Sequence, residues 1–367
     1  IRTGLGRFKR QVSGYSLEHL LPENGRNLAS FLVGSEGTLA LVTEATVRLV
    51  PLQASPVLVI LGYPDMASAA DDTVPLLAHG PLAVEGLDAQ LVDAVRRAKG
   101  SVPALPAGAG WLFVEVGAEG DVDAMTRARA LADAAATDAV DIRPAGPEAR
   151  ELWRIRADGA GLGGRTPAGN PAWPGWEDSA VPPENLGAYI REFEALLGSH
   201  GLAGLLYGHF GDGCVHVRLA MPLETPEGVA HSRAFLQSAA RICAAHGGSV
   251  SGEHGDGRAR GELLRFMYTP EKCSTCSPAS STSSTRTTSS TPGCSPPPWT
   301  RPRPPLAPGC GMPAAPGMPG LPLLLARSSC SPASTPSTLA CAASPPAPCP
   351  RTAASPSPTT AATSRPP

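Results

Sequence analysis

Short apolar runs along the first 272 residues have the length and composition of β-strands. The runs at 57–61, 82–86 and 111–116 are rich in branched and aromatic residues and are bounded by Gly, Pro or Asp. After the Gly-rich turn at 34–38, an apolar stretch and an alternating stretch predict two more strands, at 39–43 and 45–50. Each of these segments needs a neighbouring strand to pair with.

Helical spacing of apolar residues separates these strands. An Asp or a Pro begins several of the helical stretches, as expected at helix N-termini, and Asp121 is one predicted N-cap. We predict helices over 65–79, 88–99, from 121 onward, 148–156, 183–200 and 228–245, a Gly/Pro-rich loop over 159–175 and a hairpin over 205–219. Interleaved strands and helices indicate a mixed α/β or α+β domain.

The composition changes sharply near Lys272. From Cys273 to Pro367 there is no Asp, Glu, Lys, His, Asn, Gln, Ile, Val, Phe or Tyr, and more than half of the 41 prolines lie there. Such a segment cannot bury a core, so we predict a low-complexity disordered tail over 273–367. The total absence of ten residue types suggests the hypothesis of a reading-frame slip in a GC-rich gene. The chain also begins at Ile1 rather than Met, and we interpret it as a fragment.

The charge and cysteine content narrow the classes of function. Residues 1–272 hold 24 basic and 32 acidic residues, and no basic patch indicates a nucleic-acid partner. Only Cys214 and Cys243 lie there, which argues against a disulfide scaffold and agrees with a reducing, cytoplasmic setting. The sequence contains no apolar run of ~20 residues, so it predicts no transmembrane segment. A peripheral association with the membrane stays open.

The densest polar motif is Tyr207-Gly-His-Phe-Gly-Asp-Gly-Cys-Val-His-Val217. Asp212-Gly213 is a strong signal for a two-residue hairpin turn, which would place His209 directly opposite His216. Two imidazoles at that separation can share one metal ion. An ordinary hairpin with two polar residues on its solvent face is the alternative at this stage.

A second motif, Ser249-Val-Ser-Gly-Glu-His-Gly-Asp-Gly257, surrounds Glu253 and His254 with glycines. Glu253 would give a third metal ligand, and His254 would remain free to titrate near neutral pH as a general base. Arg154 and Arg156 lie about 200° apart on a helix and should have different roles, because 100° separates successive residues. Arg156 is the candidate for binding a substrate carboxylate, and Arg154 for a solvated position.

These residues resemble a known family. Gly34-Ser-Glu-Gly-Thr-Leu39 is similar to the end of the FAD-binding, PCMH-type domain of vanillyl-alcohol-oxidase-like flavoproteins. Gly208-His-Phe-Gly-Asp-Gly-Cys-Val-His216 and Ser251-Gly-Glu-His-Gly255 resemble the signatures of their FAD-linked oxidase C-terminal domain. The branch is that of D-lactate dehydrogenase, the glycolate oxidase flavin subunit and D-2-hydroxyglutarate dehydrogenase. The resemblance implies an α+β fold with an antiparallel sheet covered by helices, residues 1–52 ending the FAD-binding domain and 53–272 forming the C-terminal domain.

The resemblance also implies roles for matching positions. It makes His209, His216 and Glu253 ligands of a divalent metal, Zn or Mn, His254 the catalytic base and Arg156 the partner of the substrate carboxylate. It places Gly34, Ser35, Glu36, Gly37, Thr38, Val42 and Cys214 near FAD, although relatives mostly carry Asn where Cys214 stands.

The implied reaction is oxidation of a small D-2-hydroxy acid to the 2-oxo acid, with electrons passing to a quinone, a cytochrome or an iron–sulfur protein. Trp176 falls where relatives that bind a dicarboxylate carry Lys, which favours D-lactate. Two alternatives stay open. One is an ether-lipid synthase-like flavoenzyme of the same superfamily. The other is an inactive product that binds metal but no FAD, because the phosphate-cradling loop of the FAD domain should precede Ile1.

Overall fold

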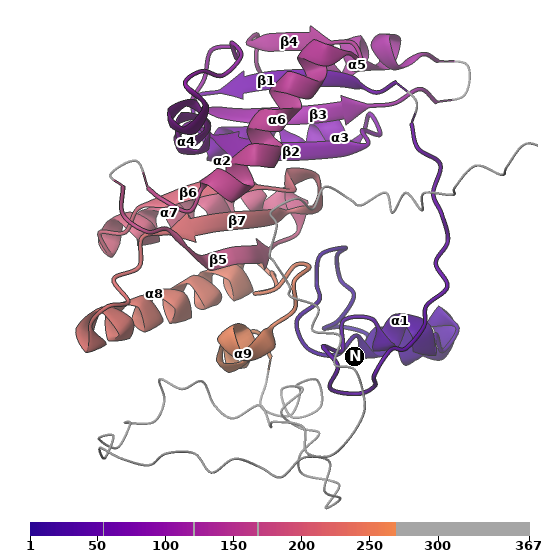
Figure 1. The fold of residues 1–367 in the computed structure, drawn as a ribbon. Helices are drawn as coiled ribbons and strands as arrows, with labels where there is room; N and C mark the ends of the chain where they lie inside the picture. The colour runs from indigo at the N-terminus through magenta and orange to yellow at the C-terminus, as the bar shows by residue number, and fades with distance from the viewer. Residues whose placement is uncertain (54, 120–121, 167–168, 269–367) are drawn as a thin grey trace, which may run out of the picture. The chain divides into compact units, whose positions relative to one another are not determined.

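The computed structural model of the chain describes residues 1–268 except 54, 120–121 and 167–168 (Figure 1). The predicted tail at 273–367 and the predicted N-cap Asp121 therefore lie outside the described residues. The described elements carry the candidate site on a single antiparallel sheet and on the loops beside it.

The first 53 residues contain only short helical turns. These are η1 (Leu17–Leu20), η2 (Pro22–Asn24) and α1 (Leu28–Leu32), whose first turn is capped by the Asn27 side chain. The strands predicted at 39–43 and 45–50 are wrong, because this stretch is extended but pairs with no strand in the described part of the chain. Leu41 is 88 % exposed and Val50 is 83 % exposed. An alternating pattern indicates that a segment is able to join a sheet. A strand forms only when a neighbouring strand is present to share its backbone hydrogen bonds.

Seven strands form one sheet in the order β4-β1-β3-β2-β6-β7-β5, and every pairing is antiparallel. The strands are β1 (Val57–Tyr63), β2 (Ala83–Asp88), β3 (Gly110–Val116), β4 (Val140–Arg143), β5 (Trp173–Ala180), β6 (Gly204–Gly208) and β7 (Cys214–Leu219). The predictions of an antiparallel sheet and of the α+β class are confirmed. Strands β4 and β5 were not predicted. The first residues of β5, Trp-Pro-Gly, have a turn-like composition, and the sequence therefore assigned them to the end of the predicted loop.

Helices follow the strands in the predicted order. They are α2 (Met66–Asp71), α3 (Thr73–Leu77), α4 (Ala89–Lys99), α5 (Ala124–Asp133), α6 (Pro147–Leu162), α7 (Leu186–Ser199), α8 (Pro226–Ala245), α9 (Gly257–Arg260) and α10 (Leu264–Met267), with single turns η3 (Pro183–Asn185), η4 (Phe210–Asp212) and η5 (Gly261–Leu263). The helix predicted from Asp121 begins later, because the Asp123 side chain accepts the Thr126 N–H and caps α5.

Helix α4 illustrates how local sequence fixes an element. The Asp88 carboxylate accepts the Leu91 N–H at 2.7 Å and begins the helix, and Gly100 ends it with a left-handed φ of 84°. Leu91, Val92 and Val95 lie on one buried face. Burial of each such side chain contributes about 1.5–3 kcal/mol, so packing rather than capping holds the helix on the sheet.

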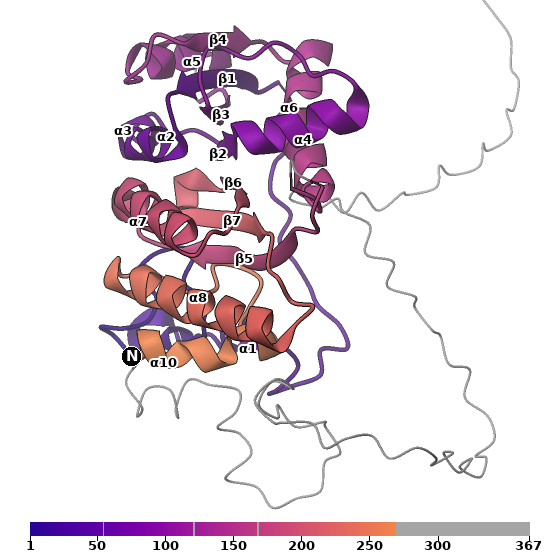
Figure 2. The ribbon, with the colours of Figure 1, turned by 90° about the vertical axis from the view of Figure 1, so that its left-hand side faces the viewer.

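The sheet separates two hydrophobic cores. Along β1, Val59 and Leu61 face the larger core, and Leu58 and Ile60 face the smaller one, as the two-residue period of a strand requires. The larger core contains buried side chains of α2, α5, α7 and α8, whereas α4 and α6 close the smaller core (Figure 2). Figures 1 and 2 place α4 and α6 against β1, β3 and β2 and α7 on the other face beside β6 and β7, while α8 runs along the edge of the sheet formed by β5.

The predicted hairpin exists, but its register differs from the expected one. Strands β6 and β7 pair Tyr207 with His216, so His209 lies beyond the ladder. The turn is longer than two residues, because η4 occupies it and the Cys214 N–H bonds back to the His209 carbonyl at 3.1 Å. A shift of two residues preserves the face of each side chain, so His209 becomes a diagonal neighbour of His216.

Candidate active site

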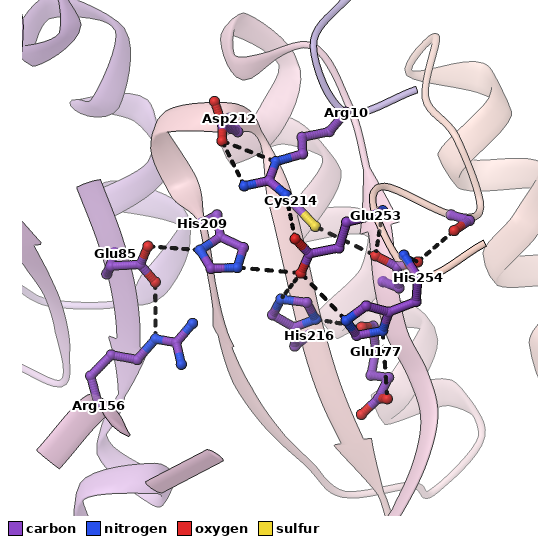
Figure 3. A network of polar contacts seen from close by, with 12 residues as sticks. Arg10, Glu85, Arg156, Glu177, His209, Asp212, Cys214, His216, Glu253 and His254 are labelled. Atoms are coloured by element: carbon purple, nitrogen blue, oxygen red, sulfur yellow. Dashed lines mark hydrogen bonds and ion pairs between the residues drawn. The ribbon is translucent and has the colours of Figure 1, made fainter. Parts of the chain in front are cut away.

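Four predicted side chains meet at one carboxylate oxygen (Figure 3). The Nε2 atoms of His209, His216 and His254 lie 3.3, 3.5 and 3.4 Å from Glu253 Oε1. The His209 and His216 rings are perpendicular, with centroids 5.3 Å apart, and the His216 and His254 rings are stacked at 5.6 Å. The turn between β6 and β7 and the distant loop at 249–257 thus build one polar centre.

The outer nitrogen of each hairpin imidazole is held by a partner from another strand. His209 Nδ1 lies 2.7 Å from Glu85 Oε1 on β2, and His216 Nδ1 bonds to the Glu177 carbonyl on β5. These contacts direct both Nε2 atoms toward Glu253. Hydrogen bonds of this kind fix the tautomer and ring orientation of histidines that bind metals.

The loop that carries Glu253 and His254 is shaped by a buried carboxylate. Asp178 on β5 accepts the Glu253 N–H at 3.0 Å, the His254 N–H at 2.9 Å and the Ser251 hydroxyl at 2.5 Å. Asp178 is fully buried, and these three donors satisfy its two oxygens. Asp178 was not predicted from the sequence, and its role here is to hold the backbone of both site residues.

The titration behaviour of the cluster follows from burial and from these contacts. Burial alone would lower the pKa of His209, but hydrogen bonds to Glu253 and Glu85 outweigh it and raise that pKa to about 9. For His216 the hydrogen bond to the Glu177 carbonyl offsets only part of the effect of burial, and burial lowers the pKa of His216 to about 4. The hydrogen bonds from His209 and His254 hold the pKa of Glu253 far below its usual range, and the same bond to Glu253 raises the pKa of His254.

Arg156 reaches the same face from α6. Its Nε donates to Glu85 Oε2 at 2.9 Å, and its guanidinium lies 5.3 Å from the centre of the Tyr207 ring. The side chain is 15 % exposed and is therefore mostly buried beside Glu85 and Tyr207. Arg154 is exposed on the other side of the helix, in agreement with the prediction that the two arginines differ.

Arg10 is a site residue that the sequence did not reveal. Its Nε lies 2.9 Å from Asp212 Oδ2 in the hairpin turn, and its Nη1 bonds to the second oxygen of Glu253. Lys9 Nζ lies 2.7 Å from Asp212 Oδ1. Residues before β1 therefore supply a cation to the cluster, and no motif signalled this contact across more than 200 residues.

The residues predicted to approach FAD divide into two groups. Gly34, Glu36 and Gly37 have left-handed φ values of 80°, 54° and 68°, and Ser35 is buried inside this turn. Both Glu36 carboxylate oxygens lie 3.1 Å from the Gly257 N, and Thr38 Oγ1 lies 2.8 Å from the Tyr15 hydroxyl. The turn therefore lies against the loop that carries His254.

The other two predicted flavin residues lie apart from that turn. Val42 belongs to the extended exposed stretch and is 67 % exposed. Cys214 is fully buried at the start of β7, with its sulfur 3.9 Å from Asp178 Oδ1, and burial raises its thiol pKa well above the usual value. The sulfur is thus a packed group rather than an ionised one.

The donor atoms of the cluster suit a divalent transition metal. Two imidazole nitrogens and one carboxylate oxygen are a common ligand set for Zn or Mn and leave coordination positions open. A ligand atom from each of Asp178, His216, Glu253 and His254 lies within 4.8 Å of the others. Because Asp178 already accepts three hydrogen bonds, His209 is the better third ligand beside His216 and Glu253.

Trp176 does not face the site. It is buried in the larger core, where its Nε1 donates to the Tyr189 hydroxyl at 2.7 Å and its ring stacks on Phe193. The Trp176 side chain therefore does not contact the cluster, and the substrate preference drawn from this position stays a prediction. Its neighbour Glu177 faces the cluster instead, 3.8 Å from His254 Nδ1 and 3.4 Å from Arg218 Nη2.

The fold and the site define an α+β domain whose antiparallel sheet carries a histidine–glutamate centre. Residues 52–277 match the family described as FAD linked oxidases, C-terminal domain, and the chain belongs to this family. The family resemblance drawn from the two motifs is therefore confirmed.

Several curated proteins are similar to the chain. D-2-hydroxyglutarate dehydrogenase of Pseudomonas putida is 33 % identical over 294 residues, which cover 76 % of this chain and 29 % of that protein. The probable mitochondrial D-lactate dehydrogenase of Danio rerio is 32 % identical over 253 residues, covering 67 % of this chain and 49 % of the relative. The chain thus spans less than a third to about half the length of these relatives. Among the described residues, no helix is both long and apolar enough to cross a membrane.

Proposed function

We propose that the chain carries the substrate and metal site of an FAD-dependent dehydrogenase that oxidises a small D-2-hydroxy acid to the 2-oxo acid. The convergence of His209, His216 and His254 on Glu253, with Arg156 on the same face, is the observation that carries this proposal. D-lactate is the substrate expected from the sequence. D-2-hydroxyglutarate is the second candidate, because the Pseudomonas relative bears that name and the Trp176 side chain does not contact the cluster.

The geometry gives each side chain a task in this reaction. The Arg156 guanidinium, already held by Glu85, would bind the substrate carboxylate as a planar fork. His254 is 46 % exposed on its side chain, so a substrate hydroxyl can approach its imidazole and transfer its proton there. Glu177, beside His254 Nδ1, would stabilise the imidazolium that forms.

The metal and the flavin supply the remaining chemistry. His209, His216 and Glu253 would hold a divalent ion that lowers the pKa of the substrate hydroxyl. When bound, FAD supplies the two-electron acceptor for the hydride that leaves Cα. We further propose that the electrons pass to a quinone, a cytochrome or an iron–sulfur protein, and that the protein is cytoplasmic or peripheral to the membrane.

Turnover with a flavin readout tests this proposal. The purified chain is incubated with FAD and Mn²⁺ or Zn²⁺, its absorbance is recorded between 350 and 500 nm, and dye reduction is followed with D-lactate and with D-2-hydroxyglutarate. We expect His254→Gln to lower kcat about 10²–10⁴-fold, as loss of a general base does, and Arg156→Lys to act mainly on KM. A chain that binds metal but neither FAD nor substrate would support the inactive alternative and contradict this proposal.

A further inference from the structure

Glu85 is a buried charge in the middle of β2, whose other carboxylate, Asp88, ends the strand and caps α4. Glu85 is 7 % exposed, and its neighbours Val84 and Leu87 belong to the two cores. A carboxylate in such a position is unfavourable unless it is paired on both oxygens. The partners of Glu85 therefore indicate why β2 carries a charge at this point.

The two oxygens of Glu85 hold two different site residues. Oε1 lies 2.7 Å from His209 Nδ1, and Oε2 accepts the Arg156 Nε–H at 2.9 Å (Figure 3). His209 belongs to the hairpin turn and Arg156 to α6, so the sequence separations from Glu85 are 124 and 71 residues. In the described part of the chain, Glu85 is the side chain that contacts both.

The sheet register explains this placement. Strands β2 and β6 pair Gly86 with Gly208 and Leu87 with Tyr207, so the next step along the same register brings Glu85 opposite His209. Gly86 permits this close approach, because a Cβ there would lie 2.4 Å from the Phe210 ring. Arg156 reaches Glu85 from the face of the sheet that α6 covers, because Leu152 and Ile155 of this helix are buried in the smaller core.

We propose that Glu85 is a positioning residue that orients His209 and Arg156 together, so that the metal ligand and the carboxylate-binding residue share one brace. This inference rests on the proposed function, because it takes His209 as a ligand and Arg156 as the substrate anchor. Glu85 touches neither metal nor substrate and acts through these two side chains. Hydrogen-bond partners of metal ligands typically change metal affinity 10–100-fold when they are removed.

Glu85→Gln tests the brace, because the amide replaces one of the two carboxylate oxygens with an NH₂ donor, so one of the two partners loses the oxygen it faces. Glu115→Gln is the matched control: Glu115 lies on the adjacent strand β3, is partly buried, and bonds to neither His209 nor Arg156 in the described residues. The full 367-residue chain is titrated with Zn²⁺ and with Mn²⁺ against a competing chelator. In the metal-free chain, NMR follows the Arg156 Nε–H signal, assigned through its loss in Arg156→Lys.

The expected result is an affinity loss of about 10–100-fold in Glu85→Gln, with loss or a large shift of the Arg156 Nε–H signal. Glu115→Gln should change the affinity less than twofold and keep the signal. Arg156→Ala should weaken metal binding in the parent chain but add nothing in the Glu85→Gln chain, because the shared brace is already broken.

Two outcomes would overturn the inference. If Glu85→Gln binds both metals within twofold of the parent chain, Glu85 does not position His209. If the Arg156 signal persists unchanged in Glu85→Gln, Glu85 does not hold Arg156. Failure of the proposed function is distinguishable: a parent chain that binds neither metal removes the metal centre and the His209 half of the brace, while the Arg156 signal still reports the other half.

Discussion

Replacement of Asp178 by Asn is the sharpest test of how the site loop is held. The change keeps the size of the side chain but converts one acceptor oxygen into an NH₂ donor. In the native chain both oxygens face donors: Oδ1 accepts the Glu253 N–H, and Oδ2 accepts the His254 N–H and the Ser251 hydroxyl. Either orientation of the amide therefore sets an N–H group against another donor.

The magnitude follows from the groups involved. A hydrogen bond to a charged group contributes about 1.5–3 kcal/mol, and a buried donor left without a partner costs about 1–3 kcal/mol. Loss of one bond, with one donor unsatisfied, should lower the free energy of unfolding by about 3 kcal/mol. For a domain of this size that corresponds to a fall in Tm of roughly 6–12 °C. Glu253 would also lose its backbone anchor, so Zn²⁺ affinity should fall with stability.

Urea denaturation followed by circular dichroism measures the first effect, and chelator competition measures the second. Asp93→Asn is the control, because Asp93 is partly exposed on α4 and pairs, in the described part of the chain, with Arg96 one turn away. Its effect should stay within about 0.5 kcal/mol, the usual range for surface substitutions. If Asp178→Asn were as stable as Asp93→Asn, or bound Zn²⁺ as tightly as the parent chain, the anchoring role of Asp178 would be refuted.

Three further predictions concern the core, the turn and the pH dependence of the site. Phe193→Ala should lower the free energy of unfolding by about 3–5 kcal/mol in urea denaturation, since Phe193 is fully buried against Trp176, Tyr189 and Phe235; equal stability would contradict the packing. Gly213→Ala should lower Tm strongly, because φ is 72° and a Cβ would lie 1.9 Å from the Val181 carbonyl oxygen, whereas Gly164→Ala meets open space and should be neutral. His209 has a pKa of about 9 and must lose its proton to bind metal, so Mn²⁺ affinity should rise about tenfold per pH unit from pH 7 toward 9; a flat profile in the titration would exclude His209 as a ligand.

Local signals in the sequence were sufficient for most of the fold and for the hairpin part of the site. The strand predicted at 57–61 and the helix predicted over 88–99 each depend on neighbouring residues, and both predictions were confirmed. The proximity of His209 and His216 was also predicted, although for a tighter turn than η4 makes. The prediction survived because the register error was two residues, which leaves both imidazoles on one face.

The residues that the sequence did not reveal act over long separations. Glu85 looks like an ordinary polar position of a strand, and Asp178 follows the Gly/Pro-rich loop predicted over 159–175. Their partners are fixed by the strand order, which places β2 beside β6 and β7 beside β5. No period or motif encodes that order, so the supporting carboxylates could be identified only after the sheet was known.

The sequence pattern divides the chain at residue 52, but side-chain contacts around the candidate site connect residues on both sides of this division. Arg10 bonds to Glu253, Glu36 bonds to the Gly257 N–H, and the Asp256 carboxylate accepts the Gly14 N–H at 2.6 Å. Burial raises the pKa of Asp256 to about 6, although the bond from Gly14 favours its charged form. Two separate segments before β1, one around Arg10 and Gly14 and one at Glu36, thus contact the loop that carries His254. The backbone that holds His254 therefore depends on residues from both sides of the boundary, and the cluster is a property of the combined chain rather than of the C-terminal domain alone.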